Sequence, residues 1–164
     1  VIFERPKQAA IVDAMIKAHP YEEVAYDVYP LANASPRIGA GMIGQLAKPM
    51  AELTFLNSLK RKMNTGCVRH TSVRGKDVKT VAVCGGSGSF LLGAAMANKA
   101  DVFVTGDFKY HQFFDAEDKI VIADVGHYES EQFTIELLGD LLKQKFPKFA
   151  VHFTQVNTNP INYL

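Results

Sequence analysis

The second half of the chain alternates short apolar segments with helical ones, and this rhythm constrains the fold more than any other feature. The apolar segments lie at residues 78–84, 101–104, 120–123 and 149–153. They are rich in β-branched and aromatic residues, which predicts strands. Helices are predicted at 90–98, 110–116 and 129–145. Strands that alternate with helices indicate right-handed βαβ units, so we expect an α/β fold with a mainly parallel sheet.

The first half of the chain predicts fewer elements and one domain boundary, within residues 33–50. An amphipathic helix is expected near the start of the chain, followed by a strand at 24–29. Residues 33–50 hold five glycines and prolines, so this stretch is expected to be a loop or an edge strand. A helix over 51–63 and a strand over 67–73 lead into the second half.

Length and charge narrow the functional classes. The chain has 164 residues, and 18 Lys and Arg against 17 Asp and Glu give a formal net charge of +1. A near-neutral chain has no overall field to attract nucleic acid or an anionic membrane, so neither is an expected partner. No apolar run reaches the length of a membrane-spanning helix. Two cysteines, Cys67 and Cys84, cannot build a disulfide framework, which favours a reducing, cytoplasmic location.

A polar cluster follows each predicted strand of the second half. The clusters are the Gly85–Gly88 loop, Thr105-Gly106-Asp107 with His111, Asp124 with His127 and Glu131, and Asn157–Asn159. Ligands of parallel sheets bind in the crevice beyond the carboxyl ends of the strands. We therefore expect the four clusters to open on one edge of the sheet and to form the functional site.

His127 and Glu131 are the sharpest pair in this set. They lie four residues apart at the start of a helix, which places both side chains on one face, one turn apart. An imidazole and a carboxylate in this arrangement can bind one divalent cation, although a hydrolytic metal site needs three or more ligands. The spacing also fits an acidic first turn with a capping histidine. Spacing alone leaves both interpretations open.

Asp107 and His111 repeat this spacing after a Thr-Gly turn. They could be metal ligands, a pair in which the carboxylate fixes the tautomer of a histidine, or a general acid and base. We name them as the catalytic candidates. The structural alternative is an aspartate N-cap with an incidental histidine on the first turn of the helix.

The glycine loop and the neighbouring cysteine have simpler interpretations. Gly85-Gly86-Ser87-Gly88 precedes a helix and is compatible with a phosphate cradle, but it lacks the Lys-Ser/Thr of a P-loop and the dinucleotide spacing. A tight turn from strand to helix is favoured. Cys84 ends an apolar strand, so it is expected to be a buried structural thiol.

Several motifs occur here in the order in which a known family carries them. They are Val81–Ser89, Ala100–Asp107 with Tyr110-His111, Asp124–Glu131 and Asn159-Pro160, preceded by Gly39–Leu46. Together they resemble the C-terminal half of the Nif-three-like family, whose members carry the name GTP cyclohydrolase I type 2 homologue. The likeness covers about residues 37–164. Residues 1–32 are similar to the end of the ferredoxin-like (PII/CutA-like) domain inserted in longer bacterial members.

The resemblance implies two domains and a metal centre. Residues 1–32 would end the insert, and 33–164 would form the C-terminal half of an α/β/α layered metal-binding domain, the last part of a three-part protein. The family's metal ligands map onto His127 and Glu131, with Asp107 and His111 lining the site. A further His pair and an Asp are expected from an N-terminal half outside this chain. The resemblance also implies a toroidal homohexamer.

These features lead to one functional hypothesis and an alternative. The first is a metal-dependent, hydrolase-like protein, with two divalent ions per subunit, that acts on an unknown, nucleotide-like small molecule. Zn, Mn, Fe or Ni suits a histidine–carboxylate ligand set. The alternative is a non-catalytic metal-binding scaffold or small-molecule sensor, with the PII-like insert reading a ligand. A role on DNA is a third hypothesis, against which the near-neutral charge speaks.

Overall fold

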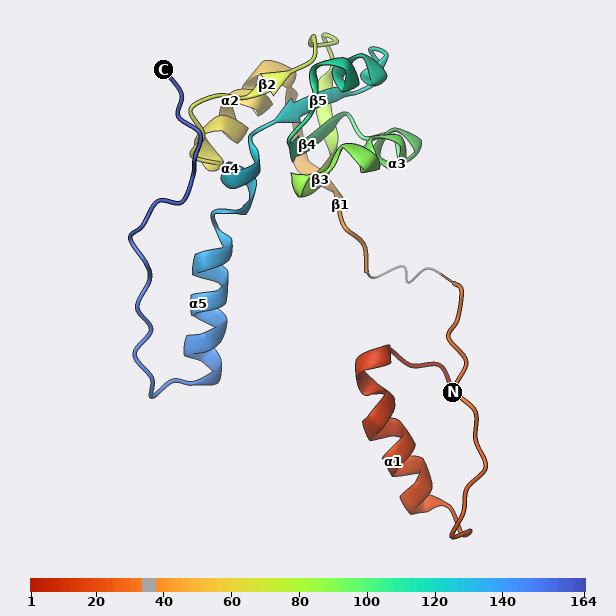
Figure 1. Ribbon diagram of the computed structural model, residues 1–164. Helices are drawn as coiled ribbons and strands as arrows, with labels where there is room; N and C mark the ends of the chain where they lie inside the picture. The colour runs from red at the N-terminus through yellow and green to blue at the C-terminus, as the bar shows by residue number, and fades with distance from the viewer. Residues whose placement is uncertain (34–37) are drawn as a thin grey trace. The chain divides into compact units, whose positions relative to one another are not determined.

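The computed structural model describes residues 1–33 and 38–164 in two compact units, Val1–Pro36 and Arg37–Leu164 (Figure 1). The described part of the first unit contains a 3₁₀ turn, η1 (Arg5–Lys7), and a helix, α1 (Gln8–Ala18). The strand expected at 24–29 does not form, because none of the described residues of this unit pairs with it. The assignment of residues 1–32 to a PII/CutA-like domain stays a prediction.

The second unit is built on a five-stranded sheet in the order β1-β3-β4-β5-β2. The strands are β1 (Met42–Ala51), β2 (Arg69–His70), β3 (Asp77–Ser87), β4 (Val102–Gly106) and β5 (Val121–Asp124). The three central strands run parallel, and β1 and β2 join the opposite edges in antiparallel orientation. The predicted α/β class with a mainly parallel sheet is confirmed.

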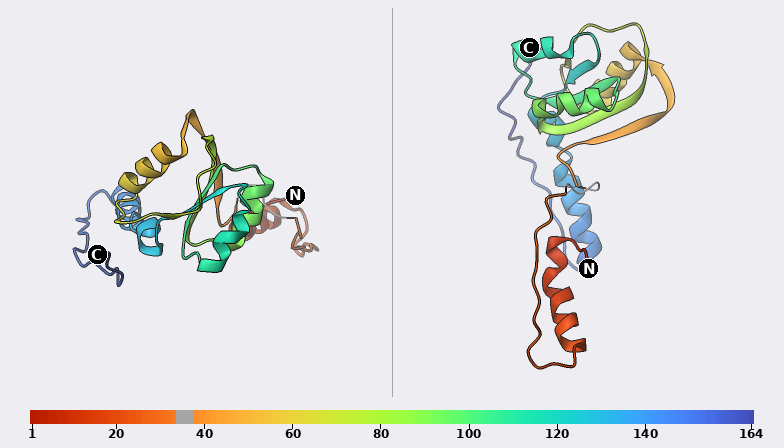
Figure 2. Two further views of the ribbon diagram at one scale, coloured as in Figure 1. Left: turned by 90° about the horizontal axis from the view of Figure 1, so that it is seen from above. Right: turned by 90° about the vertical axis from the view of Figure 1, so that its right-hand side faces the viewer.

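Helices cover both faces of this sheet (Figure 2). The helical elements of this unit are α2 (Glu52–Lys62), η2 (Ser89–Leu91) with α3 (Leu92–Ala97), η3 (Tyr110–Ala116), α4 (His127–Glu131) and α5 (Thr134–Lys145). α2 packs on one face of the sheet, and α3 and η3 pack on the other. None of the described helices combines the length and the hydropathy that crossing a membrane requires.

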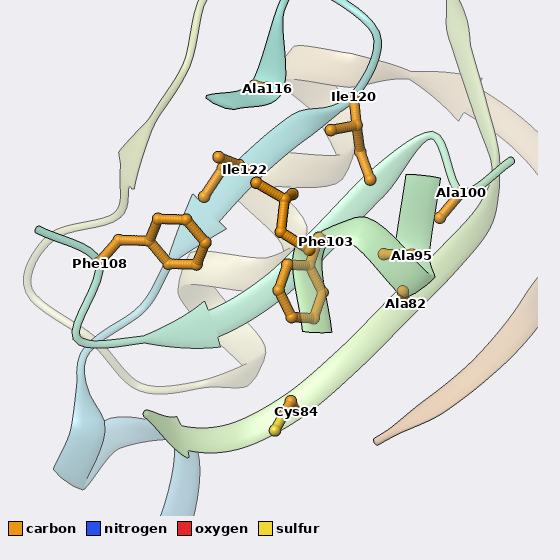
Figure 3. Close-up of a cluster of buried hydrophobic side chains, with 10 residues drawn as sticks. Ala82, Cys84, Ala95, Ala100, Phe103, Phe108, Ala116, Ile120 and Ile122 are labelled. Carbon is orange, nitrogen blue, oxygen red and sulfur yellow. The ribbon is translucent and has the colours of Figure 1, made fainter. Parts of the chain in front are cut away.

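The alternation of side chains along the strands separates two hydrophobic cores. Val102 and Val104 of β4 pack toward α2, whereas Phe103 between them packs on the opposite face. Figure 3 shows that second core, where Phe103 lies near Phe108 and Ile122. Burying a side chain of this size contributes about 1.5–3 kcal/mol, so the cores fix the central strands in register and hold their carboxyl ends together.

Three predicted segments of the second unit differ from the structure. The helix predicted over 129–145 is divided into α4 and α5, and the strand predicted over 67–73 shortens to β2. Within the described residues, 149–153 form no strand. α5 leads away from the sheet, and this segment runs back beside it, with the ring of Phe153 against Gly139 (Figure 1). The final segment therefore packs on a helix and does not extend the sheet.

The glycine- and proline-rich stretch before α2 forms the edge strand β1. Pro49 lies where the register between β1 and β3 shifts, between Gln45 and Met50. Proline has no N–H to donate to the ladder, so it is tolerated at a bulge on an edge strand. The expectation of a loop or an edge strand over 33–50 is met by β1 in the residues that the structure describes.

Candidate functional site

Three of the predicted strand ends meet at one edge of the sheet. The carboxyl end of β3, which includes the predicted glycine loop up to Ser87, contacts α4, because the amide of Gly86 donates to Ser130 Oγ at 2.8 Å. The turn after β4 contacts the start of α4 through Asp107 and His127. The contacts of Gly86, Asp107 and His127 thus bring together the end of β3 and the segments that follow β4 and β5.

His127 lies at the centre of this cluster. Its Nδ1 lies 2.6 Å from Asp107 Oδ2, and its Nε2 lies 3.4 Å from Glu131 Oε2. Because a carboxylate only accepts hydrogen bonds, Nδ1 carries a proton and donates it to Asp107. The three side chains are about half exposed, at 48%, 46% and 53% for His127, Asp107 and Glu131.

The charge around His127 comes from these two carboxylates. The hydrogen bond with Asp107 is the largest cause of the raised pKa of His127; burial opposes it, and the negative charges of Asp107 and Glu131 add to the increase. The imidazole is therefore held in a negative environment, which also favours a bound cation.

Asp107 and His111, the predicted catalytic pair, do not share a helical turn, and their catalytic role stays a prediction. Asp107 has a positive φ of 59° and lies before the helix, since η3 begins at Tyr110 with Lys109 as its N-cap. His111 is exposed and makes no hydrogen bond within residues 1–33 and 38–164. The sharp turn after β4 directs the carboxylate of Asp107 toward His127. Of the roles considered for Asp107 in the sequence, this geometry matches a carboxylate that fixes the tautomer of a histidine.

Gly86 allows the close packing of the end of β3 against the His127–Glu131 pair. A Cβ at this position would lie 2.6 Å from Glu131 Oε1 and 3.3 Å from His127 Nε2, and the φ of Gly86 is +61°. The amides of Gly86 and Gly88 donate to Ser130 Oγ and Thr105 Oγ1. These two amides are used within the protein. The tight turn expected at Gly85–Gly88 is not what forms: Gly85–Ser87 are the last residues of β3, where its register with β4 shifts between Val83 and Ser87.

The C-terminal segment reaches the same region by another route. Asn159 Nδ2 donates to Oε1 of the buried Glu129 at 3.1 Å. The ring of Tyr163 lies close to Gly66, and burial together with the nearby Glu129 carboxylate raises the pKa of Tyr163. The polar segment predicted to follow a fourth strand therefore contacts α4, although no strand precedes it.

Asp124 and Arg69 also belong to the site. Asp124, only 2% exposed, accepts hydrogen bonds from the amides of Phe108 and Gly126, and its carboxylate pairs with the Arg69 guanidinium. The sequence places Asp124 at a strand end but gives Arg69 no recognisable partner. Only the pairing of β2 with β5 brings Arg69 opposite Asp124.

His127 and Glu131 fit the requirements of two ligands of one metal ion. Two ligand atoms that each lie about 2.0–2.2 Å from a tetrahedral Zn²⁺ are roughly 3.3–3.5 Å apart. The 3.4 Å between Nε2 and Oε2 agrees with this separation. No group of three or more His, Cys, Asp or Glu suited to a metal occurs in the described part of the chain, so these residues offer two of the ligands that a complete site needs.

Comparisons with known proteins agree on one family. The family model for Duf34/NIF3 (NGG1p interacting factor 3) matches residues 8–160. A GTP cyclohydrolase 1 type 2 homolog of Halalkalibacterium halodurans is 39% identical over 94% of this chain and 42% of its own length. One of the same name from Bacillus subtilis is 35% identical over 99% and 45%.

Solved structures point the same way. A Bacillus cereus protein related to NIF3 superposes with a TM-score of 0.78 at 34% identity, covering 99% of this chain and 46% of that protein. Staphylococcus aureus protein SA1388 gives 0.75 at 26% identity, with 54% of its length covered. The chain spans less than half the length of the two curated relatives. With the family model covering most of its residues, this chain belongs to the Duf34/NIF3 family.

Proposed function

We propose that this chain supplies part of a divalent-metal site in a hydrolase-like protein. His127 Nε2 and a Glu131 carboxylate oxygen would bind the ion, and Asp107 would hold the imidazole by accepting the proton of Nδ1. The observation that carries the proposal is the arrangement of Asp107, His127 and Glu131, in which each ring nitrogen of His127 faces one carboxylate oxygen.

The chemistry of the proposal follows from the arrangement of these three side chains. A bound divalent ion would polarise a substrate oxygen and lower the pKa of a coordinated water. Asp107 keeps Nδ1 protonated, which leaves the Nε2 lone pair free for the ion. Gly86 lets the end of β3 approach His127 and Glu131 closely.

The proposed substrate is a small, nucleotide-like molecule. The support is the name that the relatives share, GTP cyclohydrolase 1 type 2 homolog, together with the half-exposed position of His127 and Glu131 at the carboxyl edge of the sheet. We propose that the complete site holds two ions and that the protein assembles as a homohexamer, with the remaining ligands outside this chain.

Metal titration of the purified protein tests the proposal. Zn²⁺ and Mn²⁺ binding is measured by calorimetry for the wild type, His127→Ala and Glu131→Gln, with His152→Ala as a matched control because His152 is also exposed but lies outside the site. Each ligand variant is expected to weaken binding by about tenfold or more, and the control to leave it unchanged. Equal affinity in all four proteins would refute the metal site.

A second measurement separates the enzyme from its alternative. The protein is incubated with GTP and simple phosphoesters in the presence of the bound metal, and products are followed by chromatography. Turnover that disappears in His127→Ala supports the hydrolase-like function. Metal binding without turnover of any substrate supports the non-catalytic scaffold or sensor.

A further inference from the structure

One buried carboxylate joins the two loops that carry Asp107 and His127. Asp124 ends β5, and its Oδ2 accepts from the amide of Phe108 at 2.9 Å while its Oδ1 accepts from the amide of Gly126 at 2.9 Å. Each carboxylate oxygen therefore binds a different loop, and a single rigid group sets the distance between the two.

These two amides are next to the proposed site. Phe108 directly follows Asp107, and Gly126 directly precedes His127. A shift of either loop would change the 2.6 Å separation between Asp107 Oδ2 and His127 Nδ1, since both residues are joined to the anchored amides by one peptide unit. The burial of Asp124 limits such shifts, because a buried carboxylate that loses an amide donor is costly.

Arg69 supplies the counter-charge. Its Nη2 pairs with Asp124 and also donates to the carbonyl of Phe108 at 3.0 Å, so it holds both the carboxylate and the loop after β4. A buried carboxylate without a cation or hydrogen bonds would be costly. The guanidinium also lies over the ring of Phe113, 5.5 Å from its centroid, which restricts its motion.

We propose that Asp124 and Arg69 are positioning residues that hold Asp107 against His127 and thereby keep the proton of the neutral imidazole on Nδ1. Neither residue is assigned to bind the metal or the substrate. That a metal ion binds the free Nε2 rests on the proposed function. That the proton lies on Nδ1 does not rest on it, because the tautomer is a property of the metal-free protein.

Asp124→Asn tests this role with little change in shape. An asparagine keeps one acceptor oxygen, but its amide nitrogen cannot accept from the second backbone amide, so one of the two loops loses its anchor. The matched control is Asp101→Asn. Asp101 also accepts from two backbone amides, those of Lys79 and Thr80, and pairs with Arg74, but it lies before β4 at the opposite end of the strand.

The measurement is the tautomer of the neutral imidazole of His127 in the metal-free protein, read from the ¹⁵N shifts of its ring nitrogens at a pH above which these shifts no longer change. The wild type and Asp101→Asn are expected to show the Nδ1–H form. Asp124→Asn is expected to show a mixture with the Nε2–H form. Loss of a carboxylate charge beside an arginine would affect both variants alike, whereas only Asp124→Asn loses an amide anchor, because Lys79 and Thr80 both donate to one oxygen of Asp101.

A second variant keeps the test decisive where Asp124→Asn does not fold. Arg69→Lys retains the charge at a half-exposed position but cannot hold Asp124 and the Phe108 carbonyl with one planar group. It is expected to give a smaller fraction of the Nε2–H form. The wild-type tautomer in every folded variant overturns the proposal. Absence of metal binding in the wild type would instead overturn the proposed function and leave the tautomer result standing.

Discussion

At the scale of single residues, the site depends on backbone that bends where side chains come close. Asp107 has a left-handed φ of 59°, which turns its carboxylate from η3 toward His127. Gly86 has a φ of 61°, and its missing side chain makes room for Glu131. Both conformations are uncommon for ordinary residues, and such conformations gather at functional sites because the surrounding structure must hold them.

Gly86→Ala is predicted to damage both stability and the site. The left-handed backbone costs an alanine about 1–2 kcal/mol, and the new Cβ would lie 2.6 Å from Glu131 Oε1. Denaturant unfolding should therefore show this loss, and metal titration should show weaker binding than in the wild type.

Gly75→Ala separates these two effects. Gly75 has a similar φ of 73°, but nothing lies within 4 Å of the position of its Cβ. The free energy of unfolding should fall by a similar amount while metal affinity stays at the wild-type value. Equal loss of affinity in both variants would show that strain alone, and not the contact with Glu131, explains the effect.

At the scale of elements, the helices differ in how much they contribute to the core. Leu92 of α3 is 6% exposed, whereas Leu138 of α5 is 53% exposed. The other large apolar side chains of α5 are also exposed in this chain, among them Ile135, Leu137, Leu141 and Leu142. α5 therefore contributes little to the two cores that fix the sheet.

Leucine truncation measures this difference. Leu92→Ala removes a buried side chain and is predicted to cost about 2–5 kcal/mol of unfolding free energy, whereas Leu138→Ala should change it by less than about 0.5 kcal/mol. Urea unfolding of the two variants gives both values. A cost above 2 kcal/mol for Leu138→Ala would mean that this helix face is covered in solution.

At the scale of the whole molecule, the sheet has a functional edge and a structural edge. Opposite the site, Arg74 connects three segments by contacting the buried Glu52 of α2, Asp101 before β4 and the carbonyl of Lys119 before β5. Burial alone would raise the pKa of Glu52 and Asp101. Hydrogen bonds from Arg74 and from backbone amides outweigh it and lower the pKa of both groups.

This network predicts a loss of stability in acid. A lowered pKa means that the folded state binds fewer protons than the unfolded state. The stability that Glu52 and Asp101 contribute is therefore fully present above their ordinary pKa values of 4.5 and 3.8, and it is lost as the pH falls below these values. Unfolding free energies measured from pH 7 to pH 3 should fall in the wild type and fall less in Arg74→Gln. If the unfolding free energy fell equally with pH in the two proteins, Arg74 would not be the group that lowers the pKa of Glu52 and Asp101.

The sequence by itself predicted the fold class and most of the second unit. Short apolar segments rich in β-branched residues that alternate with helices predict a parallel sheet, because strands covered by helices on both faces are buried along their whole length. Local spacing also placed His127 and Glu131 on one helical turn, since residues four apart on a helix are neighbours whatever surrounds them.

Only the tertiary structure decided which other side chains lie beside His127 and Glu131. Asp107 is twenty residues from His127 in the chain, and Arg69 is fifty-five from Asp124. Spacing paired Asp107 with His111, four residues away, but the backbone leaves β4 in a left-handed turn before η3 begins. The partners of a side chain across a sheet depend on strand order and register, which are set by the packing of the whole core and not by any local segment.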